Sequence, residues 1–312
     1  MSLEHNLAPH KFESLKPDNN SARPLPLDWQ TYETKAREEW RELLGSDPEE
    51  NQVQQFLELH PAMVPGGSGD VGPGGHHGSD LGLLFTQPAL VGAGDSYVPD
   101  FMWVTRSSGL ITPILIEIEK PSKLWFTKKG TPTADFSQAR DQLNNWRAWF
   151  NTEGNRDIFR RKYLFTVDKY EDRPIVPQFL LVYGRESEFG PNSTHNNPKQ
   201  LRFKRNSQLA ADETARSFDS LSPNYNHSQS ITAKLTTKGI VPFAFSPVYS
   251  TGPIPSLGIE ALNSPDAAFE RTVMMTEERK AYLLERWNYW SNIGRETAGA
   301  SRGLMVREYG LE

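Results

Sequence analysis

The sequence predicts a mixed α/β fold in which a central sheet is flanked by helices, with extra helices at the N- and C-terminal ends. Near both ends, apolar residues recur every three or four positions, as in amphipathic helices. Two apolar runs, residues 97–105 and 111–119, are joined by a short polar segment, and a third run covers 178–183. This order of helix, strands, helix and strand differs from the strict alternation of a doubly wound sheet or barrel.

Composition excludes several classes of function. The chain has 312 residues and no cysteine, which rules out disulfides, thiolate metal sites and cysteine nucleophiles. No apolar stretch is long enough to cross a bilayer and no signal peptide is readable, so we expect a cytoplasmic protein without a membrane partner. Neither GxGxxG after a strand nor GxxxxGK[ST] occurs, which argues against nucleotide binding.

Charge is unevenly distributed along the chain. The net charge is −5, yet residues 123–205 carry sixteen Lys and Arg against nine Asp and Glu. A surplus of this kind most often marks a solvated face, and it also allows a polyanion to dock.

The N-terminal part, residues 1–46, is expected to form a polar arm and then a helix that starts at Asp28 and stops at Gly45. A second helix should begin after Asp47, with Glu50 completing a capping box, and end at Pro61. We therefore interpret Glu50 as a cap residue.

Residues 64–81 are rich in glycine and are predicted to form a long loop. The loop contains His76 and His77 near Asp80, which can mimic a metal site. Flexible histidines flanked by glycines seldom form a preorganised set of ligands, so we do not favour this interpretation.

The two apolar runs predict a β-hairpin around residues 106–109. If its turn centres between Ser107 and Ser108, Asp100 lies opposite Leu115 and diagonal to Glu117, although a bulge at Pro113 would shift this register.

Because side chains alternate along a strand, Asp100, Glu117 and Glu119 project from one face. Clustered carboxylates repel one another unless protons or cations intervene, and oxygen ligands suit Mg²⁺ or Mn²⁺. The alternative interpretation is a solvated strand edge.

The remaining pattern predicts a helix over 133–150, a buried strand over 178–183 and a loop over 190–199. It then predicts a helix over 207–221, a strand over 241–248, and a helical stretch from Ser264 that is interrupted near Thr276. We divide the chain into three parts, namely the N-terminal arm and helix, a central domain at 47–258 and a helical extension at 259–312.

The spacing of Pro99-Asp100 and Glu117-Ile118-Glu119-Lys120 is similar to the PD-(D/E)xK nuclease signature. A longer series of motifs resembles the Shedu family of bacterial anti-phage nucleases. These motifs are Phe56-Leu-Glu-Leu-His60-Pro61, Pro99-Asp100-Phe101, Glu117-Ile-Glu-Lys-Pro121, Gly130-Thr-Pro-Thr133, Gln142-Leu143 with Trp146, Tyr183-Gly184-Arg185 and Ser217-Phe-Asp-Ser-Leu221.

The resemblance implies a restriction-endonuclease-like PD-(D/E)xK core over 47–258 and a homo-oligomeric, metal-dependent DNA endonuclease that cuts phage or other foreign DNA. It makes Asp100 and Glu117 ligands of Mg²⁺ or Mn²⁺, and places Gln142 at the phosphate or its water. Glu119 stands where the signature has lysine. We favour Glu119 as a further metal ligand, and Lys120 is the lesser candidate for the missing amine.

Two other functions remain open at this point. A catalytically weak or inactive nuclease fold would bind or regulate nucleic acid without cutting it. A glycoside hydrolase would use Asp100 and Glu117 as acid and base and would work in the presence of a chelator.

Overall fold

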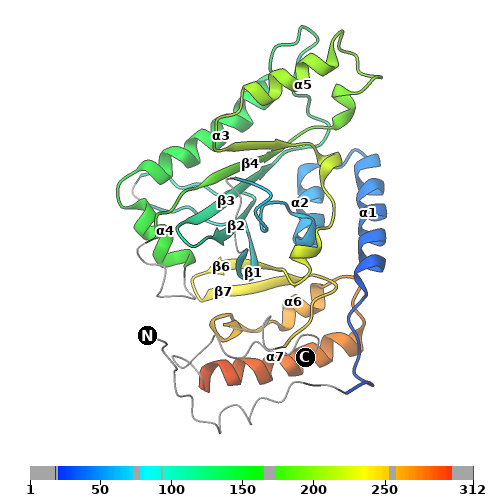
Figure 1. Cartoon of the computed structure of the whole chain (residues 1–312), viewed down its shortest axis with the longest axis vertical. Coiled ribbons are helices and arrows are strands. Elements are labelled where there is room, and N and C mark those ends of the chain that lie inside the picture. The colour runs from blue at the N-terminus through cyan, green and yellow to red at the C-terminus, as the bar shows by residue number, and fades with distance from the viewer. Residues whose placement is uncertain are drawn as a thin grey trace.

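A computed structural model describes residues 18, 20–72, 78–92, 94–164, 173–252, 258–296 and 312. The predicted mixed α/β class is confirmed, because a seven-stranded mixed sheet carries helices on both faces (Figure 1). His76 and His77 lie outside the described residues.

The helices are α1 (Trp29–Gly45), α2 (Glu50–Leu59), α3 (Ala134–Asn151), α4 (Asn155–Tyr163), α5 (Pro198–Ser207), α6 (Asp266–Arg271) and α7 (Glu277–Glu296). The strands are β1 (Ser79–Thr86), β2 (Phe101–Arg106), β3 (Ile111–Ile118), β4 (Gln178–Val182), β5 (Glu213–Arg216), β6 (Ile231–Thr236) and β7 (Gly239–Phe245). Their order across the sheet is β5-β4-β3-β2-β1-β6-β7.

Strand direction determines where loops meet. β1, β2 and β3 form an antiparallel meander, whereas β3, β4 and β5 run parallel. The C-terminal ends of β3, β4 and β5 therefore share one edge of the sheet, which in open α/β sheets is the edge where ligands bind.

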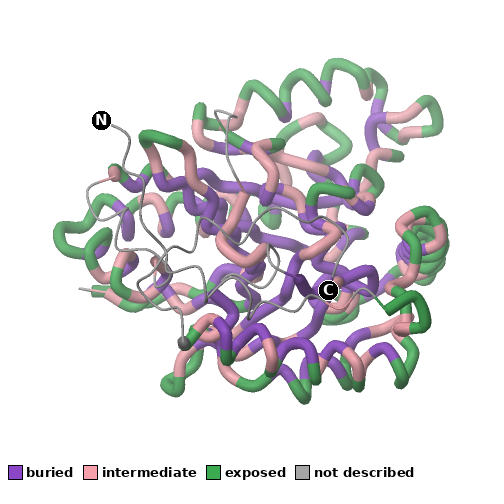
Figure 2. Tube along the Cα trace, turned by 60° about the horizontal axis from the view of Figure 1, so that its bottom comes forward, coloured by how far each residue is buried: buried purple, intermediate pink, exposed green. Residues whose placement is uncertain are grey.

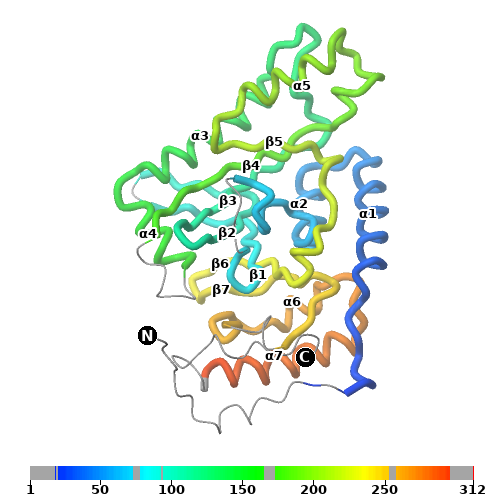
Figure 3. Tube along the Cα trace, viewed as in Figure 1, coloured from blue at the N-terminus to red at the C-terminus, as the bar shows by residue number. Residues whose placement is uncertain are grey.

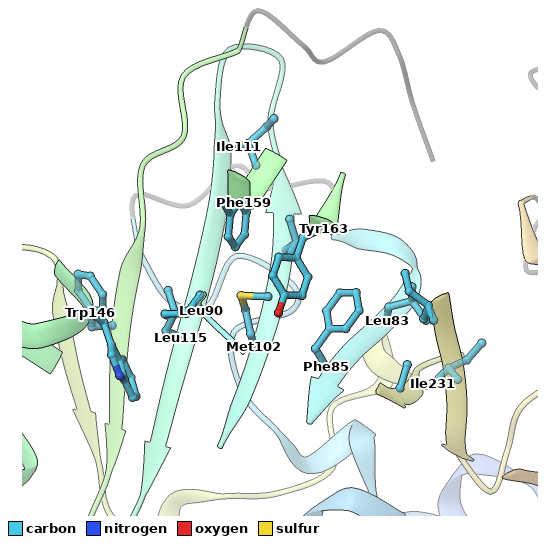
Figure 4. Close-up of a cluster of buried hydrophobic side chains, with 14 of the residues drawn as sticks. Leu83, Phe85, Leu90, Met102, Ile111, Leu115, Trp146, Phe159, Tyr163 and Ile231 are labelled. Atoms are coloured by element: carbon cyan, nitrogen blue, oxygen red, sulfur yellow. The ribbon is translucent and has the colours of Figure 1, made fainter. Parts of the chain in front are cut away.

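Two apolar cores lie on opposite faces of the sheet. Met102 and Leu115 belong to the first core, together with residues of α3 and α4 (Figure 4). Residues of α6 and α7 belong to the same core. Ile114, Ile116 and Ile118 belong to the second, which α1 and α2 cover. Figure 2 shows buried chain through the middle of the molecule and exposed turns on the outer helices. The strands are therefore covered on both sides, which explains why β3 and β4 read as continuous apolar runs.

Several predicted elements are confirmed. Asp28 caps α1, its side chain accepting the Thr31 N–H at 2.9 Å, and Thr133 caps α3 in the same way. The C-terminal helical stretch is interrupted between α6 and α7, next to the predicted break at Thr276.

Other predicted elements are wrong. The helix expected over 207–221 is replaced by strand β5, because residues 213–216 pair in parallel with β4, and this tertiary pairing overrides helix propensity. The helix lies earlier, as α5, which begins at the end of the predicted loop, where Asn197 accepts the Gln200 N–H ahead of Pro198.

The predicted long loop also ends too late, because β1 begins at Ser79 and pairs with both β2 and β6. Strand β6 and helix α4 have no counterpart in the prediction.

The terminal helices pack on the sheet. Trp40 of α1 donates to the Phe218 carbonyl at 3.1 Å, and Trp287 of α7 stacks edge-on against Phe245 of β7. The segment before α1 runs beside α7 (Figure 3), where Arg279 donates to the Pro24 carbonyl at 2.7 Å. The division at 46/47 and 258/259 stays a prediction. None of the described helices is long and apolar enough to cross a membrane.

Candidate active site

The register of the β2–β3 hairpin brings two acids together. Phe101 pairs with Ile116, so Asp100 faces Glu117 one step further along the ladder. The predicted register, with Asp100 opposite Leu115, is wrong by two residues because the turn spans 107–110. A shift of two residues preserves the face on which side chains project, so the predicted common face of the acids survives. Pro113 pairs with Val104 without a bulge.

Hydrogen bonds hold Asp100 in place. Its Oδ2 accepts the Ile118 N–H at 2.8 Å, and the Asp100 and Glu117 carboxyl groups share a hydrogen bond. Glu117 and Glu119 are only 7% and 6% exposed. Carboxylates buried this deeply are costly unless a proton or a cation compensates them.

A fourth acid, Glu50, joins this group, and its prediction as a cap residue is wrong. Glu49 is the N-cap of α2 and forms the capping box with Gln52, which leaves the Glu50 side chain on the first turn, next to Glu119. The sequence contains a signal for this role. Glu49 and Glu50 are adjacent, and because a capping box uses only one of them, the other is available to the site. We call Glu50, Asp100, Glu117 and Glu119 the acid cluster.

Electrostatics favour protons on three members of the acid cluster, Glu50, Asp100 and Glu117. Burial raises the pKa of Asp100 to about 7, against the opposing N–H of Ile118 and with the help of the charges on Glu50 and Glu119. Burial and the charge of Asp100 raise the pKa of Glu117 well above its usual range. Burial and Glu119 likewise raise the pKa of Glu50. Like charges forced together behave in this way, and a divalent cation would relieve them.

The donors fit a hard divalent cation. All are carboxylate oxygens, and Asp100 and Glu117 are adjacent. Within the described ranges, no three His, Asp or Glu side chains are already gathered to hold one ion together. Mg²⁺ commonly uses one or two protein carboxylates and keeps several waters. The set of three ligands therefore stays a prediction.

Two lysines follow the acid cluster and take different partners. Lys120 Nζ donates to Glu49 Oε1 at 2.6 Å, away from the buried acids. Lys123 forms an ion pair with Glu119. Partial burial opposes its charge, but the hydrogen bond to Glu119 raises the pKa of Lys123. Sequence reasoning placed Lys123 among general phosphate contacts. The signal it missed is the Glu–Lys spacing of four residues across the turn at Pro121.

The helix α3 carries the other predicted site residue. The Gln142 side chain is half-buried, and among the described residues it has no side-chain hydrogen-bond partner. Its part in the site stays a prediction.

The basic middle of the chain does not form one face. Helices α4 and α5, which carry several of these cations, lie well apart in the structure (Figure 1). Lys204 of α5 donates to the Gly130 carbonyl at 2.6 Å, which places α5 beside the loop that continues from Lys123. Arg205 instead stacks on Trp125 and Phe189, at 5.0 and 5.1 Å, and has a structural role.

Exposed groups remain around α5 for a polyanion to contact. We call them the α5 surface, and they are Lys128, Lys129, Lys199, Arg202, Phe203 and Lys204. Phe203 is 76% exposed, and Arg202 also pairs with Glu186.

Arg185 is a structural residue. Its guanidinium binds Asp219 through Nε and Nη2, at 3.0 and 2.9 Å, and also donates to the Leu44 carbonyl at 2.9 Å. This pairing ties the end of β4 to α1 and to the segment after β5.

Comparison with known proteins identifies a family for this chain. A family model described as Shedu protein SduA, C-terminal, matches residues 47–222, which include α2, the hairpin, α3, β4 and β5. No curated protein and no solved structure matches the chain significantly.

Proposed function

This chain belongs to the Shedu family, whose SduA C-terminal model spans more than half of it, and from that membership we propose a metal-dependent DNA endonuclease of anti-phage defence. The observation that carries the proposal is the acid cluster. Buried carboxyl groups, two of them adjacent on neighbouring strands, are a costly arrangement that a fold without use for a cation has little reason to keep.

In this proposal the adjacent pair Asp100 and Glu117 holds Mg²⁺ or Mn²⁺, with Glu119 at hand as a further ligand. A divalent cation bound there would supply the Lewis acidity that activates a water and stabilises charge on a phosphoryl group. Asp100 keeps its orientation because Ile118 donates to it, and β3 sets the direction of Glu117. Gln142 on α3 would orient the attacking water or a phosphate oxygen.

DNA would lie along the edge of the sheet that carries the acid cluster. The α5 surface supplies cations for backbone phosphates, and its exposed Phe203 offers a face for apolar contact. Phosphate contacts of this kind position a duplex without reading its sequence. A PD-(D/E)xK core and a homo-oligomeric assembly are part of the same proposal.

Cleavage of supercoiled plasmid tests the proposal. Purified protein should nick or linearise plasmid in Mg²⁺ or Mn²⁺ and do neither in a chelator. Glu117→Gln should lower the rate at least ~100-fold, because it removes one donor of the adjacent pair. Glu153→Gln, at an exposed glutamate after α3, is the matched control and should cleave normally.

Different outcomes separate the rival functions. Binding of DNA without cleavage in any divalent cation would replace the nuclease by a nucleic-acid-binding module. Activity that persists in a chelator would point to chemistry without a metal.

Metal binding can be measured independently of cleavage. If Mn²⁺ binds the folded protein, it should raise the melting temperature, because it adds about 2.7 kcal/mol to the unfolding free energy at a free concentration a hundred times the dissociation constant. Asp100→Asn should abolish this rise.

A further inference from the structure

We propose that Lys123 supplies the positive charge at the scissile phosphate that the lysine of the PD-(D/E)xK signature would supply, and that Glu119 holds it there. This inference rests on the proposed nuclease function. Glu119 occupies the signature position of the lysine, and a carboxylate offers phosphate oxygens no positive charge. The Lys123 ammonium meets the Glu119 carboxylate, so the cation reaches the acid cluster from four residues further along the chain.

Lys123 is placed to meet a substrate as well as Glu119. Its side chain is 31% exposed, while that of Glu119 is 7% exposed. The buried carboxylate therefore holds the ammonium, while part of the Lys123 side chain remains open to solvent. An ammonium carries three donors, so contact with Glu119 leaves donors for a phosphate oxygen.

The segment around Lys123 is held by hydrogen bonds, so its position is fixed before substrate binds. The Lys123 N–H donates to the Lys120 carbonyl at 3.0 Å and closes a turn. The carbonyl of Leu124, the residue after Lys123, accepts hydrogen bonds from Thr133 Oγ1 at 2.7 Å and from the Tyr183 hydroxyl at 3.2 Å. A site residue whose supporting contacts are complete loses little entropy when it acts.

A buried carboxylate completes this support. The two oxygens of Glu188 accept the N–H groups of Trp125 and Phe126, each at 2.9 Å, and His195 contacts the same carboxylate at 3.1 Å. Gly184 makes the close approach possible, because a Cβ there would lie 2.9 Å from the Lys123 carbonyl oxygen.

Thr133, Tyr183 and Gly184 stand in the motifs that carry the family resemblance, and all three contact residues 123–125. A shared structural task therefore links motifs that lie far apart in the sequence. That task is to hold the segment that carries Lys123.

Lys120 is a poorer candidate for the same part. It follows Glu119 directly, yet its ammonium is 2.6 Å from Glu49 at the N-cap of α2. The groups that act on its charge are Glu49 and Asp47, and neither belongs to the acid cluster.

The step assigned to Lys123 is electrostatic. The oxygen of water bonds to phosphorus and gives up a proton to solvent, while the bond to the 3′ oxygen breaks and that oxygen takes up a proton from solvent. Negative charge grows on the non-bridging oxygens as this happens. The Lys123 ammonium donates a hydrogen bond to one of them and stays protonated throughout, so it transfers no proton. Charge that is positioned before the reaction needs no reorganisation when the transition state forms.

Single-turnover cleavage at saturating DNA and Mn²⁺ tests the assignment, with Lys120→Ala as the matched control. Lys123→Ala and Lys123→Gln should each lower the rate at least ~100-fold. Both should leave the affinity for uncleaved DNA, measured in Ca²⁺, close to that of the parent, and both are assayed well below their own melting temperatures, because each leaves the buried Glu119 without its cation. Lys120→Ala should cleave within ~3-fold of the parent.

Glu119→Gln separates an anchor from a ligand. If Glu119 acts by holding Lys123, Glu119→Gln slows cleavage without raising the Mn²⁺ concentration that gives half the maximal rate. Combined with Lys123→Ala, it should then add little to the loss, because residues that act as a unit are not additive.

Three results would overturn the assignment of Lys123. These are near-normal cleavage by both Lys123 variants, an equal loss in Lys120→Ala, or additive losses in the double variant. Each presupposes a parent protein that cleaves, so each leaves the nuclease function standing. A parent that cleaves with no divalent cation defeats both proposals together.

Discussion

The carboxylate of Asp100 accepts the backbone N–H of Ile118 at 2.8 Å, which joins the start of β2 to the end of β3. This contact keeps the two strands in register at the point where the acids face each other. The same side chain thus serves the fold and the site, and its replacement should affect both. For this reason substitutions at Glu117 and Lys123, which make fewer contacts with the backbone, give cleaner tests of chemistry.

Removing one buried acid should stabilise the metal-free protein. Glu117→Gln keeps the size of the side chain and removes a carboxyl group whose pKa is raised by burial and by Asp100. Its charge costs stability as the pH rises above the unfolded pKa, so at pH 8 in chelator we expect a gain on the order of 1–3 kcal/mol. Thermal or denaturant unfolding measures this gain. A lower melting temperature would mean that Glu117 is stabilised by its surroundings.

Gly184 should tolerate alanine less well than Gly154 does. Both have positive φ, +58° and +80°, but a Cβ at Gly184 would lie 2.6 Å from Trp125 Nε1, whereas Gly154 has open space. We expect Gly154→Ala to cost about 1 kcal/mol of unfolding free energy and Gly184→Ala about 2–4 kcal/mol. Urea denaturation of the two variants makes the comparison. Equal losses of unfolding free energy in the two variants would show that the segment after Lys123 can shift to make room for the added methyl group.

Stability should fall as the pH falls from 6.5 to 4, in part because of His227. Burial lowers the pKa of this histidine to about 4, with Asp70 and a backbone contact acting the other way. As the pH falls, the unfolded chain therefore binds a proton at His227 that the folded chain does not bind. This difference lowers the unfolding free energy by on the order of 3 kcal/mol at pH 4. Denaturant unfolding at several pH values in this range should show that the unfolding free energy of His227→Gln falls less steeply with pH than that of the parent. An equally steep fall in both proteins would contradict the prediction.

The Arg185–Asp219 pair should contribute to stability and not to cleavage. Asp219 also accepts the Glu186 N–H at 2.6 Å, and its hydrogen bonds lower its pKa despite burial. Asp219→Asn should cost about 1–2 kcal/mol of unfolding free energy. Glu33→Gln, which removes an exposed ion pair within α1, should cost less than about 0.5 kcal/mol. Near-normal cleavage by Asp219→Asn, assayed well below its melting temperature, completes the test.

Local patterns predicted much of the fold. The caps at Asp28 and Thr133 and the alternation of β3 are written in neighbouring residues, so α1, α3 and the hairpin followed from sequence. Strand β5 could not be predicted in the same way, because residues 213–216 become a strand only by pairing with β4. Its partner lies some thirty residues earlier in the chain, beyond the reach of a periodicity argument.

The candidate site shows the same boundary. The alternation of side chains along the strands was enough to place Asp100, Glu117 and Glu119 on one face. The predicted register was wrong by two residues, and a shift by an even number leaves the face unchanged. Glu50 and Lys123 were not predicted to belong to the site because each lies on a segment outside the hairpin. Which of two adjacent glutamates caps α2, and how the chain turns after Pro121, depend on contacts that form only in the folded protein.

The hairpin that carries Asp100 and Glu117 makes their spacing a property of one short stretch of chain, closed by a tight turn. Nothing at either terminus has to arrive before those two groups are neighbours. A hairpin of this kind can keep its two acids together even when other parts of the chain are replaced.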